Sequence, residues 1–417
     1  MKRCVRILQI GTYSSCNKGD AAMELSTATE LLERIEGARV VIQSPFPELD
    51  QNAYRGVRVS RTTRRRLLYN TLLVSRAALY TFLARLGARI DGLIENAEIH
   101  EFLAADLVVD LSGDMLTEDY GVHVAYSHYL PLLMALALKR PVAVCAQSIG
   151  PFKWTRPIAR RILERANLVT VRDRISFDYL KELGVKNANL HQTADMAFLL
   201  RPAPASRVDE ILAAEALPAG AGPLLGVSVS GLIKDRYRAR NPLSRSIPFE
   251  ELVAGVLDVV AAALDARVLF VSHVTGPAKA KDDRVVSGAV AERMRAPATV
   301  LRGDYAPDEL KGVIARTQLF FGARMHANIA ALSSGVPTVA ISYSHKTEGI
   351  TRALGQEARV VPIRSMTAPD AQALLLRTWE ERAEVAASLA ERLVAIRREA
   401  ARNVELMLEI LEANRRA

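Results

Sequence analysis

The stretch that decides the fold is residues 318–350, which read Gln-Leu-Phe-Phe-Gly-Ala-Arg-Met-His-Ala-Asn-Ile-Ala-Ala-Leu-Ser-Ser-Gly-Val-Pro-Thr-Val-Ala-Ile-Ser-Tyr-Ser-His-Lys-Thr-Glu-Gly-Ile. The short apolar run at 319–321 is typical of a buried strand. An Ala-rich helix follows to about Ser334, and Gly335-Val336-Pro337 closes it with a glycine and a proline. Residues 338–341 indicate the next strand, and a second helix begins near Lys346. The stretch therefore predicts two consecutive strand–helix units of an α/β fold.

Basic and polar side chains lie in the connections between the ends of these strands and the starts of the helices that follow. Arg324 and His326 open the first helix, and Tyr343 and Lys346 stand at the opening of the second. In an open α/β sheet this edge is where ligands bind, and a helix N-terminus with cationic neighbours suits an anion. We therefore expect an anion site here. The alternative for Arg324 is a structural ion pair.

Length and composition place the chain in a broad class. A chain of 417 residues, half of them hydrophobic, favours two α/β domains, each with its own core. The three cysteines, Cys4, Cys16 and Cys145, have the spacing of neither a zinc site nor a disulfide framework. The apolar run Val5–Ile10 predicts a strand rather than a signal peptide. We therefore expect a cytoplasmic protein in a reducing compartment.

The alternation of strands and helices continues along the chain and predicts a division into domains. Pro, Ala and Gly are densest at residues 201–223, which indicates a linker. We expect two Rossmann-like domains facing a cleft. We expect the chain to consist of four parts: an N-terminal domain on the acceptor side (1–205), the linker (206–222), a C-terminal domain on the donor side (223–365) and terminal helices (366–417).

The first domain carries a basic amphipathic insertion at residues 55–90. Residues 55–89 contain nine arginines and no acidic residue, which equals the net charge of +9 for the whole chain. Leu68, Leu72, Leu79, Phe82 and Leu86 supply an apolar face beside them. An arginine within the span disfavours a membrane-crossing helix, so we expect an amphipathic helix that binds an anionic membrane surface. The alternative is a surface helix packed on its own domain. A nucleic-acid partner is disfavoured because no recognition motif is present.

Short motifs of the same kind are spread along the chain. They are Asn17-x-Gly19-Asp20, Gln147-Ser148-Ile149-Gly150-Pro151, Val171-Arg172-Asp173, Thr193-Ala194-Asp195, Arg324-Met325-His326, Gly335-Val336-Pro337 and Tyr343-x-x-Lys346. In order and spacing they resemble the polysaccharide pyruvyl transferase family over about residues 5–355. Where that family often has a run of glycines, this chain has Ser112-Gly113-Asp114. Because of this departure, the acceptor or the geometry of this loop is expected to differ from the family pattern more than the reaction does.

The resemblance implies a function and an architecture. Enzymes of this family transfer pyruvate from phosphoenolpyruvate to two hydroxyls of a sugar, which forms a ketal, in cell-surface or exopolysaccharide biosynthesis. The implied architecture is that of the B-type glycosyltransferases (GT-B), in which the last helix packs back on the first domain. Phosphoenolpyruvate would be a co-substrate, so no cofactor is expected, and no group of residues has the spacing of a metal site.

The same resemblance and the strand-end positions suggest roles for individual residues. We expect Arg324 and His326 to be catalytic, with His326 as the general acid because the unperturbed imidazole pKa is near neutrality. Donor binding would fall to Arg324, Lys346, Arg172 and Tyr343. Weaker candidates for acceptor binding are Asn17, Asp20, Asp114, Gln147 and Asp195, of which Asp20 is equally well interpreted as a helix cap.

Two other functions stay open at this point. One is a GT-B glycosyltransferase that uses a nucleotide sugar, in which Glu348 would contact the ribose. The other is a non-catalytic component of a polysaccharide-assembly complex, which the presence of Arg324, His326 and Lys346 disfavours. The expected partners are phosphoenolpyruvate, a sugar acceptor that includes lipid-linked sugars, and the inner face of the cytoplasmic membrane.

Overall fold

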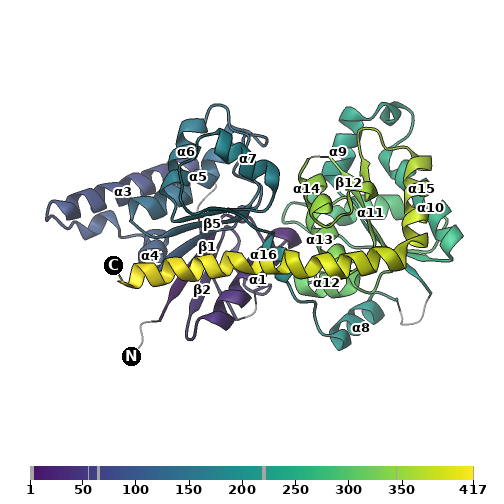
Figure 1. Ribbon diagram of the computed structural model, residues 1–417, viewed down its shortest axis with the longest axis horizontal. Coiled ribbons are helices and arrows are strands. Elements are labelled where there is room, and N and C mark those ends of the chain that lie inside the picture. The colour runs from purple at the N-terminus through teal and green to yellow at the C-terminus, as the bar shows by residue number, and fades with distance from the viewer. Residues whose placement is uncertain (1–3, 55, 63–65, 218–221, 344, 417) are drawn as a thin grey trace. The chain divides into compact units, whose positions relative to one another are not determined.

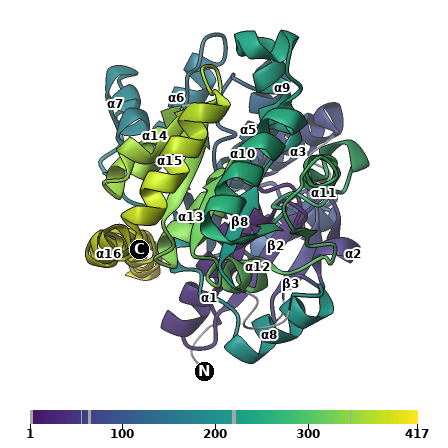
Figure 2. The same ribbon diagram turned by 90° about the vertical axis from the view of Figure 1, so that its right-hand side faces the viewer.

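A computed structural model describes residues 4–54, 56–62, 66–217, 222–343 and 345–416, with backbone only for His345 and Lys346. The chain forms two compact units. The first comprises residues 1–15, 23–196 and 398–417, and the second comprises residues 16–22 and 197–397. Each unit is an open parallel sheet with helices on both faces (Figures 1 and 2). The expected pair of Rossmann-like domains is confirmed.

The first unit has a seven-stranded parallel sheet in the order β3-β2-β1-β4-β5-β6-β7. The strand order reverses between β1 and β4, where Leu8 pairs with Val108. Most strand residues are buried, as expected for a parallel sheet covered on both faces. The strands are β1 (Arg6–Ile10), β2 (Arg39–Ser44), β3 (Arg58–Arg61), β4 (Leu107–Asp110), β5 (Val142–Gln147), β6 (Leu168–Val171) and β7 (Leu190–Gln192).

Helices of the first unit cover its sheet on both faces. One face packs on α3, α4, α5, α6 and α7 through a core that includes Phe102, Tyr129 and Leu163. Asn403 bonds Thr170 and Thr193 and so fixes the terminal part of α16 (Arg382–Arg416) in this unit. The other helices are α1 (Lys18–Arg34), α2 (Pro47–Asp50), α3 (Leu67–Arg85), α4 (Ala97–Ala104), α5 (Val122–Ala137), α6 (Arg156–Arg165) and α7 (Arg174–Glu182).

The second unit has a six-stranded parallel sheet in the order β10-β9-β8-β11-β12-β13. The order reverses between β8 and β11, where Phe321 pairs with Val227. The stretch at 318–350 thus forms the centre of this sheet, as its apolar runs predict. The strands are β8 (Leu224–Ser228), β9 (Arg267–Phe270), β10 (Ala298–Val300), β11 (Leu319–Gly322), β12 (Thr338–Ser342) and β13 (Val360–Pro362).

Two hydrophobic cores lie on the two faces of this second sheet. α10 and α15, which lie side by side in Figure 2, belong to one core. α8, α12 and α13 belong to the other. The helices are α8 (Ala205–Ala214), α9 (Gly231–Arg240), α10 (Phe249–Leu264), α11 (Asp283–Ala291), α12 (Pro307–Ile314), α13 (Met325–Ser333), α14 (His345–Ala353) and α15 (Ala368–Glu380).

The prediction of a linker at residues 206–222 is wrong for most of these residues. It contains most of α8, whose side chains Val208, Ile211 and Leu212 are buried in a core of the second unit. The prolines and alanines that suggest a linker have another use here, because Pro204 occupies the N-cap position of α8 and alanines are strong helix formers. The terminal helices also divide differently: residues 366–397 belong to the second unit, and only residues 398–417 belong to the first.

Candidate active site

Arg324 stands at the point where the second sheet reverses its strand order. It is the N-cap residue of α13, directly after β11, and its extended backbone leaves the side chain outside the helix. The neighbouring Ala323 donates its N–H to Ser228 O at the end of β8, at 2.7 Å. Ligands of open α/β sheets bind at such a switch point. The expected strand-end location of Arg324 is therefore confirmed.

The guanidinium of Arg324 forms a two-pronged ion pair with Asp283. Nε lies 2.9 Å from Oδ2 and Nη2 lies 2.7 Å from Oδ1. The Asp283 side chain is 1% exposed, whereas that of Arg324 is 24% exposed and so remains accessible to a ligand. Burial raises the pKa of Asp283 above its ordinary value, and the charge of Arg324 opposes this rise. The ion pair thus fixes the orientation of Arg324 without enclosing it.

His326 lies in the first turn of α13, against the backbone of Gly19. A Cβ atom on residue 19 would lie 2.2 Å from His326 Nδ1, closer than Cβ contacts occur in proteins. Only glycine therefore permits this packing. The Asn17-x-Gly19-Asp20 and Arg324-Met325-His326 motifs, far apart in sequence, meet at this contact. Residues 16–22 belong to the second unit, so the contact lies within that unit.

The segment around Gly19 is fastened to the loop that follows β9. Lys18 donates its backbone N–H to His273 O at 2.8 Å, and its Nζ lies 2.6 Å from Asp304 Oδ1. Asn17 Oδ1 accepts the N–H of Gly19 at 3.2 Å and so caps α1. Asp20 is therefore a residue of the first turn and not the cap. These bonds hold the start of α1 in a fixed position beside His326.

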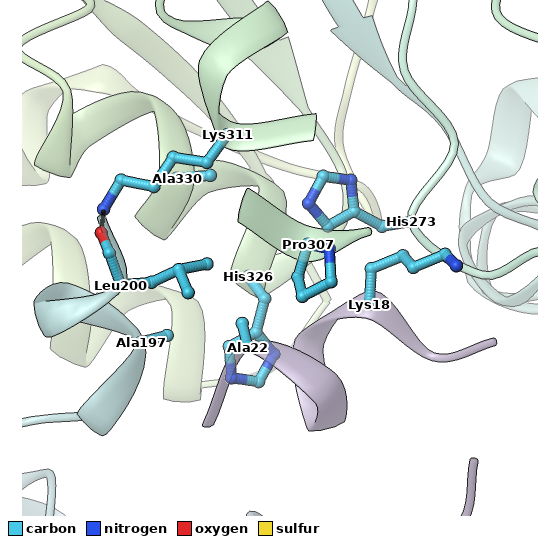
Figure 3. Close-up of a pocket in the computed structure, with 9 residues that line it drawn as sticks. All are labelled: Lys18, Ala22, Ala197, Leu200, His273, Pro307, Lys311, His326 and Ala330. Carbon is cyan, nitrogen blue, oxygen red and sulfur yellow. Dashed lines mark hydrogen bonds between the residues drawn. The ribbon is translucent and has the colours of Figure 1, made fainter. Parts of the chain in front are cut away.

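A small cavity lies beside His326. Its lining includes Lys18, His273, Lys311 and His326, and Figure 3 shows Lys311 reaching toward Leu200. Lys311 Nζ donates to Leu200 O at 2.6 Å. The cavity has a volume of about 10 Å³, roughly the smallest volume that holds one water. The cavity is therefore too small to enclose an organic substrate.

Two side chains that line the cavity, His273 and Lys311, have pKa values far below their ordinary ones. Burial, together with the nearby charges of His326, Arg324 and Lys18, lowers the pKa of His273 to about 3. His273 is therefore neutral at physiological pH. Burial, with a contribution from Arg397, lowers the pKa of Lys311 to about 7. Of these two groups, only Lys311 therefore carries positive charge near neutral pH, and only in part.

The first unit holds a second polar cluster, at the ends of β5 and β6. Arg172 Nη1 lies 2.6 Å from Asp195 Oδ2, and both side chains are 1% exposed. Arg172 Nε donates to Ser148 Oγ, which itself donates to Asp173 Oδ2. Asp173 caps α7 by accepting the N–H of Ser176. The sequence motifs at 147–151, 171–173 and 193–195 are therefore parts of one buried network.

Another polar group occupies the strand reversal of the first sheet. Gln147 Nε2 donates to Asp110 Oδ2, and Ser112 Oγ donates to Asp110 Oδ1. His128 Nδ1 lies 3.0 Å from Ser112 Oγ. A Cβ on Gly11 would lie 2.1 Å from Asp110 Oδ1, so glycine is required there too. As at His326, a glycine here permits the close approach of a polar side chain.

Comparison with known proteins decides the family. A family model described as polysaccharide pyruvyl transferase matches residues 17–345. The chain belongs to this family. The match begins at Asn17 and includes Gly19, Arg324 and His326, so it covers both motifs that meet at α13.

A curated relative and several solved structures are also similar. The amylovoran biosynthesis protein AmsJ of Erwinia amylovora is 24% identical over 383 residues, 87% of this chain and 89% of that protein. The UDP-GlcNAc 2-epimerase of Neisseria meningitidis, bound to UDP-GlcNAc, has a TM-score of 0.61 at 11% identity and covers 97% of this chain and 100% of its own. A glycosyltransferase of Rickettsia africae has a TM-score of 0.57 at 10% identity and covers 98% and 99%. These structures show that the chain has a GT-B-like fold.

The structure places the remaining predicted site residues in different surroundings. Tyr343 follows β12 and packs partly against a core of the second unit. Lys346 lies in the first turn of α14, and its side chain is outside the described part of the chain. Asp114 accepts a hydrogen bond from Tyr120 at 2.8 Å. Glu348, the residue of the glycosyltransferase alternative, lies on α14 and accepts from Ser342 at 3.4 Å. The ligand roles suggested for these residues stay predictions.

The observed surroundings of Arg172 differ most from those expected for a donor-binding residue. Its guanidinium is enclosed and already paired with Asp195, and among the described residues its Nη2 atom has no hydrogen-bond partner. Asp195 and Gln147, expected near the acceptor, are buried as well. The structure thus gives all three residues a place in internal networks. Their roles toward substrates stay predictions.

Sequence reasoning missed five residues around α13: Lys18, His273, Asp283, Asp304 and Lys311. Asp283 pairs with Arg324 across 41 positions of sequence, and Lys18 pairs with Asp304 across 286. Neither acid lies in a motif. Lys18 lies inside the Asn17-x-Gly19-Asp20 motif. It is therefore the one residue of these five that a sequence motif could have indicated. Among the residues described, no group of three or more His, Cys, Asp and Glu is arranged to hold a metal ion.

Proposed function

We propose that this protein transfers pyruvate from phosphoenolpyruvate to two hydroxyls of a sugar. The observation that carries the proposal is the position of Arg324 and His326 at the N-terminus of α13, within a chain of the polysaccharide pyruvyl transferase family. The donor carries a phosphate and a carboxylate, so its site needs several hydrogen-bond donors and cations. The partly exposed side chain of Arg324, the N-terminal turn of α13 and its helix dipole supply such groups together.

The reaction has two steps, and both require control of protons. In the first, a sugar oxygen bonds to C2 of phosphoenolpyruvate while C3 takes up a proton, and the hydroxyl loses its own. In the second, another hydroxyl of the same sugar bonds to C2 and inorganic phosphate leaves. The products are a cyclic pyruvate ketal and phosphate. No oxidant or reductant is consumed.

His326 is the residue that we assign to protonation of C3. Its ring is held by packing against Gly19 and lies on the same helix turn as Arg324. A fixed acid beside the bound donor is the arrangement that general acid catalysis requires. Arg324 would hold the donor through its side chain, which is partly exposed beside Asp283. Lys346, at the start of α14, is proposed as a further cation for the donor.

The cellular role and location are also proposals. The relative AmsJ is named as an amylovoran biosynthesis protein, and we place this protein likewise in exopolysaccharide biosynthesis. The acceptor would be a sugar of a growing polysaccharide unit, including one carried on a lipid. Phosphoenolpyruvate is a cytoplasmic metabolite, so the enzyme would act on the cytoplasmic side of the membrane.

Ligand-dependent thermal unfolding tests the donor. The protein is heated with phosphoenolpyruvate, with UDP-, GDP- or TDP-sugars, and with inorganic phosphate and pyruvate as controls. A ligand at 100 times its dissociation constant stabilises the folded state by about 2.7 kcal/mol. We expect protection by phosphoenolpyruvate and less by either fragment. Protection by a nucleotide sugar alone would favour a glycosyltransferase instead, the function of some proteins with this fold.

A further inference from the structure

Helix α3 presents an apolar stripe to solvent. Six exposed positions recur at alternating intervals of three and four residues, which places them on one face of a helix. Leu68 is 90% exposed and Leu86 is 68% exposed, large fractions for leucine. We call this stripe the outer face of α3; it comprises Leu68, Leu72, Ser75, Leu79, Phe82 and Leu86.

The opposite face of α3 already has a partner. Asn70, Leu73 and Ala77 are buried, and the helix packs on α5. Figure 1 shows α3 extending beyond the sheet of the first unit. A surface helix ordinarily presents polar side chains to water on the side that faces away from the core. Contiguous apolar residues there indicate an interaction surface. The outer face is therefore available for a partner.

Arginines without acidic partners stand at both ends of this face. Arg66 precedes α3, and Arg85 and Arg89 lie at its end and just beyond it. All three side chains are exposed, and among the described residues none of them forms an ion pair. By contrast, Arg58 pairs with Glu101 and Arg61 with Glu48. The fold thus neutralises part of the basic segment and leaves positive charge beside the outer face.

We propose that the outer face of α3 binds the surface of an anionic lipid bilayer, with the helix lying along the interface. Leu72, Leu79 and Phe82 would enter the acyl boundary, and Arg66, Arg85 and Arg89 would meet lipid phosphates. This inference is independent of the proposed reaction. It identifies a partner for a surface that the donor site does not use.

Charge distinguishes this partner from two alternatives. In a dimer through the outer face, arginines of both copies would be brought together at the ends of the stripe, and like charges repel. Membrane spanning is disfavoured although α3 is long and apolar enough by length and composition. Its inner face is buried on α5, and Arg76 in mid-helix donates to the carbonyls of Gly92 and Leu93. An anionic bilayer surface offers an apolar region for the stripe and negative charges for the arginines.

Vesicle co-sedimentation of the full chain tests the proposal. Vesicles of phosphatidylcholine with phosphatidylglycerol are compared with vesicles of phosphatidylcholine alone, at low and high salt. We expect binding to the anionic vesicles, much weaker binding to the neutral ones, and loss of binding at high salt because exposed charges are screened. Equal binding to both kinds would overturn the role of the arginines. No binding to anionic vesicles at low salt would overturn the proposal altogether.

Variants separate the apolar from the charged contribution. The triple variant L72S/L79S/F82S should reduce binding at least tenfold, and the control I158S/V259S/V394S, with exposed apolar residues of other helices, should not. The variant R66E/R85E/R89E should also reduce binding at least about tenfold, since each basic residue near an anionic leaflet contributes about 1 kcal/mol. R238E/R240E/R245E changes the charge equally on exposed positions elsewhere and should bind as the wild type does.

The same variants decide between a membrane and a second copy of the chain. Light scattering without vesicles measures the oligomeric state of the wild type and of L72S/L79S/F82S. If the wild type is a dimer that this variant converts to a monomer, and anionic vesicles are not bound, the outer face is a protein interface and the proposal fails. If the variant keeps the oligomeric state but loses vesicle binding, the outer face contacts lipid.

Discussion

The imidazole of His326 lies against Gly19 so closely that a Cβ on residue 19 would fall 2.2 Å from Nδ1. One residue opens α1 and the other opens α13, and they are 307 positions apart in the chain. Lys18 and Asn17 fasten this turn of α1 to the loop after β9. The glycine therefore has a specific task, which is to let a backbone support the ring of the proposed general acid.

The first prediction is that Gly19→Ala displaces His326. The new methyl group cannot share the space of the ring, so the ring must move or the helix must shift, at a cost of about 1–3 kcal/mol for such overpacking. We expect turnover to fall by more than tenfold while phosphoenolpyruvate still protects against thermal unfolding. Gly255→Ala in α10 is the matched control, because nothing lies within 4 Å of its added Cβ. Equal activity of both variants would show that the ring position does not matter.

The second prediction concerns His326 itself. As the general acid it assists the chemical step, and such assistance typically contributes about 10²- to 10⁴-fold. His326→Asn should lose that much turnover, measured as acceptor-dependent release of phosphate, and keep the thermal protection by phosphoenolpyruvate. His100→Asn, an exposed histidine of α4, controls for the substitution. Loss of protection and turnover together would make His326 a binding residue.

The sequence predicts those parts of the site that depend on local patterns. Strand ends and helix starts follow from the apolar runs and the glycine–proline signals at 318–350, so Arg324 and His326 are found at once. Their supports are not found, because Asp283 and Gly19 reach them through tertiary packing, which sequence spacing does not record. The misassigned linker at 206–222 has a similar cause. Proline is common both in linkers and at helix starts, and only packing distinguishes the two.

The third prediction separates the two roles of Arg324. Sequence alone allows either a ligand contact or an ion pair, and the structure shows an ion pair in which the Arg324 side chain stays 24% exposed. Arg324→Met leaves the carboxylate of Asp283 buried without its partner, which costs about 3–5 kcal/mol. The double variant D283N/R324M removes that charge and should recover most of the stability. Neither variant should be protected by phosphoenolpyruvate. Protection of the double variant would remove Arg324 from the donor site.

The stability loss of Arg324→Met should also depend on pH. The Arg324 charge lowers the pKa of Asp283 against the effect of burial, so its removal raises that pKa further. The folded variant then holds a proton that the unfolded chain, with an ordinary pKa of 3.8, releases. Its destabilisation should be largest at neutral pH and should shrink as the pH falls toward 3.8. Chemical denaturation from pH 4 to pH 8 measures this trend, and a pH-independent loss would contradict it.

The last prediction concerns the enclosed Lys311. Burial lowers its pKa from 10.5 to about 7, and its ammonium donates to the carbonyl of Leu200. Between these two pH values the unfolded chain holds a proton that the folded protein releases. The free energy of unfolding should therefore rise with pH, by up to about 1.4 kcal/mol per unit from this residue.

Lys311→Met should remove this slope. Methionine fills a similar volume without a charge, so the variant should be at least as stable as the wild type at pH 6, despite losing the bond to Leu200. By pH 9 the wild type should have gained stability relative to the variant. Urea denaturation at pH 6, 7, 8 and 9 measures both, with the exposed Lys279→Met as the control. Parallel curves for wild type and Lys311→Met would show that the buried lysine keeps an ordinary proton affinity, and that the cavity beside His326 is more open to water than its volume indicates.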